Sequence, residues 1–106
     1  RHTDLDFFSE LLEFAALRLS NRGKLVLIVP TALAETLTKI SVERGLYCSS
    51  EVQISSFEGE SVIRKIVTFE RLRVESLAKR AFVIYAAKGV YSDAYRNALA
   101  PYFLAF

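Results

Sequence analysis

The sequence predicts an α/β fold, a slice of a doubly wound sheet, and the pattern around one strand carries this prediction. Residues 25–29 are five consecutive apolar residues between a glycine-lysine turn and Pro30. Such a run is typical of a strand buried on both faces in a mostly parallel sheet. A helical pattern leads into it over residues 5–19, and another follows over residues 32–44. Helix, buried strand and helix in succession indicate a layered α/β domain.

The first helix begins with a capping signal and carries a broad apolar surface. Thr3 followed by Asp6 resembles a capping box. The width of the apolar surface predicts a helix pressed between a sheet and a further element. Its central stripe consists of Leu5, Phe8, Leu12, Ala15, Ala16 and Leu19, and it is widened by Phe7, Leu11 and Phe14. The strand over residues 24–29 should stop at Pro30, which has no N–H to donate to a ladder.

The second helix has two marked ends. Thr31 is expected as its N-cap. Gly45 stands where a Schellman motif places a glycine, with Leu46 folding back onto the helix. The buried stripe of this helix is expected to consist of Leu33, Leu37 and Ile40.

Two strands are expected to follow as an antiparallel pair. Residues 47–55 alternate in polarity, which predicts a strand with one wet face near the edge of the sheet. Residues 62–71 are apolar on both faces and are expected to lie more centrally. The connection between the two strands is too short for the crossover that a parallel pair requires.

The last third of the chain is less regular. Residues 72–80 are charged and are interpreted as a loop or a frayed strand, and residues 81–86 as a strong strand. Ser92 is expected to cap a last helix with Asp93 in its first turn. The apolar face of that helix is expected to consist of Tyr95, Leu99, Tyr102, Phe103 and Phe106.

Length and composition indicate one domain or part of one. The chain has 106 residues, of which 52% are hydrophobic and 25% charged, and its net charge of +2 is too small to indicate nucleic acid by itself. No apolar run approaches the roughly 20 residues that cross a bilayer, and no signal peptide is visible, so no membrane partner is expected. A single cysteine suits a reducing cytoplasm. The lack of methionine predicts that residues 1–106 are a partial domain from a longer protein.

Few residues carry chemistry. His2 is the only histidine and Cys48 the only cysteine, so neither a metal site of ordinary type nor a nucleophilic triad is expected. Neither GxGxxG nor a P-loop is present. The four glycines each stand where a turn or a helix cap explains them.

A basic cluster lies between residues 64 and 80. It consists of Arg64, Lys65, Arg71, Arg73, Lys79 and Arg80, against Glu70 and Glu75. Such a cluster could follow a phosphate backbone, although composition alone favours ordinary solvated positions. In the same way Tyr91, Tyr95, Tyr102 and Phe103 could stack on bases, or could be the apolar face of the last helix.

Three stretches resemble the bacterial tRNA(Val) adenine-N6 methyltransferases, a family of class I S-adenosylmethionine-dependent methyltransferases. Residues 1–3 (Arg-His-Thr) are similar to the family's Ala-Arg-His segment, shortly after its Asn-Pro-Pro-Tyr motif. Residues 21–30 (Asn-Arg-Gly-Lys-Leu-Val-Leu-Ile-Val-Pro) are similar to its Pro-Glu-Gly-Arg strand entry and Leu-Pro exit. Residues 91–96 (Tyr-Ser-Asp-Ala-Tyr-Arg) and 102–104 (Tyr-Phe-Leu) are similar to its closing Tyr-Thr-Asp-Glu-Tyr-Arg and Phe-Tyr-Leu signature, the most specific of the three.

The resemblance implies the carboxy-terminal half of a Rossmann-like methyltransferase fold: a parallel strand flanked by helices, then an antiparallel strand pair. It implies S-adenosylmethionine as the cofactor of the full-length parent and tRNA as its partner. The glycine-rich loop, the acidic ribose-binding position and the Asn-Pro-Pro-Tyr motif belong to the missing amino-terminal half. The chain alone is therefore expected to be inactive and to bind no cofactor, with no catalytic, cofactor or metal residue of its own. The RNA-binding candidates are Arg1, His2, Arg64, Lys65, Lys79 and Arg80.

One segment departs from the family, and two other interpretations stay open. The family's connection within the antiparallel pair is rich in proline and lysine, whereas residues 57–61 are Phe-Glu-Gly-Glu-Ser. The alternatives are a methyltransferase fragment acting on ribosomal RNA or protein, and a non-catalytic α/β interaction module. Without the preceding strands, the open edge of the strand over residues 24–29 predicts that the isolated chain either self-associates through that edge or is ordered only as part of a longer chain.

Overall fold

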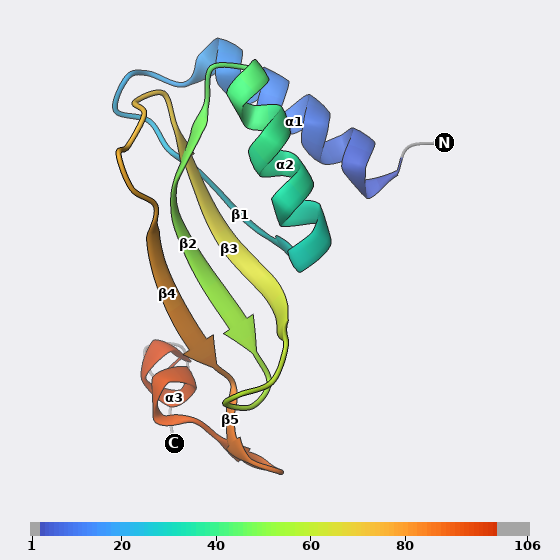
Figure 1. Cartoon of the computed structure of the whole chain (residues 1–106), viewed down its shortest axis with the longest axis vertical. Coiled ribbons are helices and arrows are strands. Elements are labelled where there is room, and N and C mark those ends of the chain that lie inside the picture. Colours follow the sequence, from blue (N-terminus) through green and yellow to red (C-terminus); the bar gives the residue numbers. More distant parts are fainter. Residues whose placement is uncertain (1–2, 100–106) are drawn as a thin grey trace.

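The computed structural model describes residues 3–99, in which two helices cover one face of a four-stranded mixed sheet (Figure 1). A two-stranded hairpin and a short third helix lie at one end of this sheet (Figure 1). The elements in order are α1 (Asp4–Arg18), β1 (Leu25–Pro30), α2 (Thr31–Glu43), β2 (Tyr47–Ser55), β3 (Val62–Glu70), β4 (Ala78–Val83), β5 (Tyr85–Ala87), β6 (Val90–Tyr91) and α3 (Asp93–Leu99). The predicted α/β class is confirmed.

The sheet has the order β1-β3-β2-β4. β3 is antiparallel to both β1 and β2, whereas β4 is parallel to β2. The predicted antiparallel pair and the central place of its second strand are confirmed. The prediction that residues 47–55 lie near an edge was wrong, because β4 pairs with the outer side of β2. The segment over residues 72–80, interpreted as a loop or a frayed strand, is therefore part of a strand from residue 78 onward.

β1 is an edge strand in the described part of the chain, where its one neighbour is β3. Leu27 and Val29 are buried, but Val26 is 56% and Ile28 60% exposed. The prediction that this strand is buried on both faces was therefore wrong for the residues described. The predicted parallel pairing of this strand is also not seen among the described residues, because β3, its one neighbour there, runs antiparallel to it.

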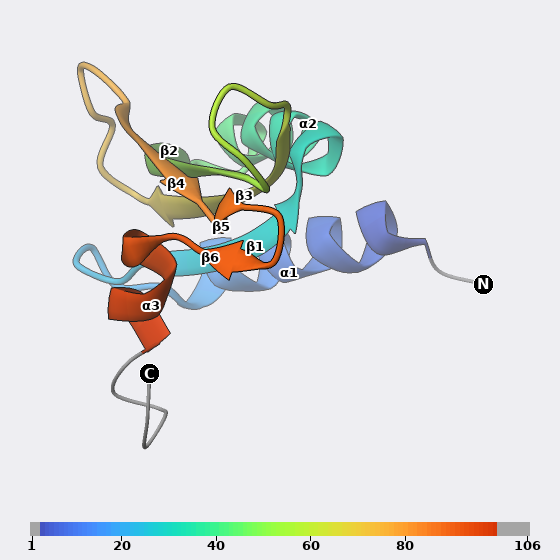
Figure 2. The same ribbon diagram turned by 90° about the horizontal axis from the view of Figure 1, so that it is seen from below.

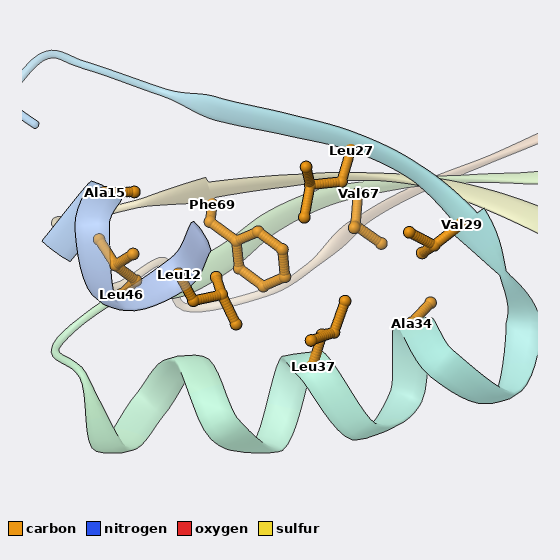
Figure 3. Packing of buried hydrophobic residues seen from close by; sticks show 9 residues of the cluster. All are labelled: Leu12, Ala15, Leu27, Val29, Ala34, Leu37, Leu46, Val67 and Phe69. Carbon is orange, nitrogen blue, oxygen red and sulfur yellow. The ribbon is translucent and has the colours of Figure 1, made fainter. Parts of the chain in front are cut away.

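The core lies on a single face of the sheet (Figure 3). From this face Leu27, Val67 and Phe69 point toward Leu12 of α1 and Leu37 of α2 (Figure 3). We call this the helix face, and the opposite side the open face. Because side chains alternate along a strand, the exposed Val26 and Ile28 belong to the open face. Figure 2, which shows the molecule from below, places α3 on the side of the sheet away from α2.

α1 has both of its ends fixed by side chains. The predicted capping box is confirmed: Thr3 Oγ1 accepts from the Asp6 amide at 3.1 Å, and the Asp6 carboxylate accepts from the Thr3 amide at 3.1 Å. At the other end, Arg71 donates to the carbonyls of Leu19 and Ala16. The outer face of α1 keeps Phe7 57% and Phe14 56% exposed, so no described element covers it in the way the sequence predicted.

α2 ends as predicted but begins differently. The Leu46 amide donates to Ser41 at 2.9 Å and the Gly45 amide to Val42 at 3.1 Å, which confirms the Schellman motif. Thr31 is not the N-cap: its hydroxyl donates to the Val62 carbonyl at 2.7 Å, which ties the helix start to β3.

Two of the three residues predicted for the buried stripe of α2 are displaced by one position. Leu37 is buried as predicted. Ala34 and Ser41 take the other fully buried positions, and Leu33 and Ile40 flank them, partly buried. Small side chains at those two positions let the helix lie close to the sheet.

The strand predicted over residues 81–86 is interrupted after Val83. The Ile84 amide donates to Ser55 at 3.0 Å and the Tyr85 amide to Ser56 at 2.8 Å, so the chain stays attached to the end of β2 as it turns into β5. The predicted Ser92 cap is confirmed, because Ser92 Oγ accepts from the Tyr95 amide at 3.0 Å. Tyr102, Phe103 and Phe106 lie outside the described residues.

Candidate functional site

The aromatic residues Phe57, Tyr85, Tyr91 and Tyr95 follow the carboxyl ends of β2 and β4 in the sequence. β1, β2 and β4 all run in the same direction, because β3 is antiparallel to the first two and β4 is parallel to β2. The arrows of β2 and β4 point toward β5 and α3 (Figure 1). Ligands of open α/β sheets bind outside the carboxyl ends of such strands. This edge is therefore the first place to look for a site.

The predicted basic residues do not form one patch. Arg64 stands opposite Ile54, and Arg80 opposite Val52, on the open face. Lys65 stands opposite Gln53 on the helix face. Lys79 stands opposite Glu51, also on the helix face. Arg1 and His2 lie outside the described residues.

Lys65 differs from the exposed Arg64, Lys79 and Arg80 because its side chain is largely buried against an acidic partner. Its Nζ lies 3.3 Å from Glu51 Oε1, and the two side chains are only 12% and 10% exposed. Gln53 Nε2 also donates to the Glu51 carboxylate at 2.8 Å. Burial alone would raise the pKa of the Glu51 carboxyl, but the hydrogen bonds from Gln53 and Lys65 and the charges of Lys65 and Lys79 outweigh it and hold that pKa below its usual range.

Four aromatic rings form a continuous stack, which we call the tyrosine ladder: Phe57, Tyr85, Tyr91 and Tyr95. Successive ring centroids lie 5.4, 5.3 and 4.7 Å apart, all in stacked geometry. Tyr95 also meets the edge of Phe82 at 6.4 Å. The ladder therefore fastens the β5–β6 hairpin and α3 to the segment that follows β2.

Sequence reasoning singled out two members of the ladder and missed the other two. Phe57 and Tyr85 each follow the end of a strand, and only the pairing of β2 with β4 brings them together. An aromatic residue just after each of two strands was the available signal. Because the ring faces of Tyr85 and Tyr91 are occupied by neighbouring rings, these residues form a rigid wall rather than an open stacking platform.

A pocket of about 370 Å³ opens beside the ladder. Tyr85, Tyr91 and Val90 contribute its apolar wall. Its charged groups are Arg96 of α3, Asp93 in the first turn of that helix, and Glu58 from the loop between β2 and β3. The pocket thus combines an aromatic wall with one donor and two acceptors.

The remaining candidates for chemistry are the thiol of Cys48 and a possible metal site. Cys48 is half-buried and its thiol donates to the Ser50 carbonyl at 3.4 Å. Burial, assisted by the Glu51 charge, raises the pKa of this thiol, which makes it a weak nucleophile. Within residues 3–99, no three His, Cys, Asp or Glu side chains are placed to hold a metal ion. No helix in the same range combines the length and apolar character needed to cross a membrane.

Comparison with known proteins gives one consistent name. The chain is 37% identical over all 106 residues to a Pedobacter heparinus protein named tRNA1(Val) (adenine(37)-N6)-methyltransferase, of which it covers 45%. It is 32% identical over 95 residues to a Haemophilus influenzae protein of the same name, covering 39% of it, and 25% identical over 104 residues to one from Bacteroides thetaiotaomicron, covering 44%. No protein-family model matches the chain.

The chain spans less than half the length of these relatives. The match falls on their carboxy-terminal half. These relatives confirm the resemblance that the three sequence motifs indicated.

Proposed function

From this homology with the carboxy-terminal half of the proteins named tRNA1(Val) (adenine(37)-N6)-methyltransferase, we propose that the chain is the substrate-side portion of a tRNA adenine-N6 methyltransferase. The observation that carries the proposal is an alignment over the whole chain that covers only 45% of the relative. In this proposal S-adenosylmethionine is the methyl donor of the parent, tRNA is its substrate, and the parent works in the cytoplasm.

An unpaired strand edge and exposed apolar surfaces support the proposal that the chain is part of a larger domain. The outer edge of β1 carries no described neighbour, and its open-face residues Val26 and Ile28 stay more than half exposed. The outer face of α1 likewise exposes Phe7 and Phe14. Apolar surface of this extent on adjoining elements is typical of an interface. A strand pairing with β1 would extend the sheet, and helices beside α1 would cover it.

The four glycines of the chain are scattered singly along it and do not form a glycine-rich loop. Gly45, Gly59 and Gly89 adopt positive φ at a helix end and in turns, and a Cβ on Gly23 would meet Leu19, so local backbone geometry and packing account for each glycine. We therefore assign S-adenosylmethionine and the catalytic motif to the portion of the parent outside this chain. Methyl transfer by these 106 residues alone is not expected.

The proposal is tested with the gene product that carries this chain. Its intact mass is measured, and methyl transfer from labelled S-adenosylmethionine is assayed on total tRNA, ribosomal RNA and protein, with the 106-residue chain as the control. We expect a product about twice as long that labels tRNA, and no labelling by the control. Labelling of ribosomal RNA or protein instead would change the substrate class. A product of 106 residues that labels nothing would favour an interaction module.

A further inference from the structure

We propose that the pocket beside the tyrosine ladder binds one amine-bearing nucleobase of the substrate RNA, adjacent to the adenine that is methylated. This inference rests on the proposed function and adds a recognition site to it. The pocket is the one formed by Glu58, Tyr85, Val90, Tyr91, Asp93 and Arg96.

The position of the pocket is the first argument. Backbone hydrogen bonds from Ile84 to Ser55 and from Tyr85 to Ser56 fix its wall to the carboxyl end of β2. The amide of Ser92 donates to Ile84 at 2.7 Å, which fixes the start of α3 to the same place. The carboxyl end of β1 lies at this edge too, since Pro30 stands opposite Arg64, which stands opposite Ile54. A substrate held at the carboxyl ends of the strands would therefore reach the pocket.

The charge of the pocket is the second argument, and it disfavours phosphate. One guanidinium, that of Arg96, stands with two carboxylates, those of Asp93 and Glu58. Such a set repels a phosphodiester. It suits a neutral group that carries both donors and acceptors: the carboxylates accept from an exocyclic amine, and the guanidinium donates to a ring nitrogen or carbonyl. Adenine, cytosine and guanine have this combination, whereas uracil lacks the amine.

The availability of these groups is the third argument. Among the described residues, no hydrogen bond or ion pair is made by the side chains of Glu58 and Arg96, and both residues are exposed. The ladder, in contrast, uses its ring faces internally and supplies a rigid apolar wall. A volume of about 370 Å³ suits a single nucleotide. Single-stranded loops, whose bases can be turned outward, are the usual targets of sequence-specific RNA recognition.

The test uses the full-length gene product and a set of anticodon stem-loop RNAs. In each RNA one loop nucleotide other than the target adenine is replaced by uracil. The variants are Glu58→Gln, Arg96→Ala and Arg96→Lys, and the matched controls are Glu60→Gln, in the same loop, and Lys88→Ala, in the hairpin. Circular dichroism establishes that each variant is folded.

We expect wild-type protein to discriminate against uracil at one loop position by about tenfold in kcat/KM. Glu58→Gln and both Arg96 variants should lose that discrimination, with KM for RNA raised more than kcat is lowered, while the controls keep it. The dependence of RNA affinity on salt should not change, because no phosphate contact is removed.

Three results would overturn the inference while the proposed function stands. The active wild-type protein could tolerate uracil at every position, the variants could match the controls, or Arg96→Ala could flatten the salt dependence, which would make Arg96 a phosphate contact. Failure of the wild-type protein to methylate any RNA would instead refute the proposed function. Arg96→Lys keeps the charge and loses the bidentate fork, so it separates base recognition from simple charge.

Discussion

Replacing Lys65 by methionine tests whether this lysine is a structural residue or an RNA contact. The substitution removes the ammonium but keeps most of the side chain's volume. It leaves the Glu51 carboxylate buried, where the Gln53 amide still donates to it and the charge of Lys79 still acts on it, but its ion-pair partner is gone. A buried carboxylate that loses its paired counter-charge destabilises the folded state.

The size of the effect follows from the geometry. At the 3.3 Å separation of Lys65 and Glu51, and with an effective dielectric constant of about 20, the Coulomb attraction is about 5 kcal/mol. The cost of removing both charges from water offsets much of it. Since each side chain keeps about a tenth of its exposure, we expect Lys65→Met to lower the free energy of unfolding by about 2–3 kcal/mol.

The assay is urea unfolding of the full-length protein, with the double variant Glu51→Leu/Lys65→Met as the control. Because the double variant leaves no unpaired charge, it should be less destabilised than Lys65→Met alone. A loss below about 0.5 kcal/mol for Lys65→Met would show a solvated surface pair and refute the reasoning. In that event a flattened salt dependence of RNA binding would favour the phosphate-binding role predicted from the sequence.

Three further predictions concern acid stability, the ladder and the open face. Because the folded-state pKa of Glu51 is lowered, its stabilisation is complete above the usual glutamate value of about 4.3 and is lost as pH falls through the lowered value; the difference in unfolding free energy between wild type and Glu51→Gln should shrink below about pH 4. Tyr91→Ala removes two stacked contacts and should lower stability by about 1–3 kcal/mol, with amide exchange in the hairpin accelerated first; unchanged exchange there would contradict the ladder. In the isolated 106-residue chain, Ile28→Lys should reduce self-association measured by light scattering, whereas the exposed Glu35→Lys should not; equal effects would exclude the open face as the contact.

The local elements of the fold were predictable because their signals are local. The capping box at Thr3 and the Schellman motif at Gly45 each depend on residues within one or two turns of a helix end. The antiparallel pairing of β2 with β3 follows from a short connection. These predictions needed no knowledge of distant segments, and all three are confirmed.

The place of β2 in the sheet was not predictable in the same way. Its outer neighbour β4 is parallel to it and follows a charged segment that gives no strand signal until its end. The apolar pattern of β1 misled for a different reason. Val26 and Ile28 are apolar although no described element covers them. Their pattern is typical of a strand that is covered by an element outside the described residues.

The division of the basic cluster could have been foreseen once its residues were assigned to strands. Arg64 and Lys65 are adjacent in β3, and Lys79 and Arg80 are adjacent in β4. Successive side chains in a strand point to opposite faces, so neither pair could act on one surface. The pocket beside the ladder, in contrast, combines the loop after β2 with the hairpin and α3, and no spacing in the sequence brings these together.

The tyrosine ladder gives the chain an internal spectroscopic probe. The sequence has no tryptophan and only five tyrosines, and three of them, Tyr85, Tyr91 and Tyr95, are stacked in this one corner. Near-ultraviolet circular dichroism depends on aromatic rings held in fixed packing. The part of that signal that comes from Tyr85, Tyr91 and Tyr95 reports on the hairpin and α3. The order of this corner can therefore be followed through a titration without attaching any label.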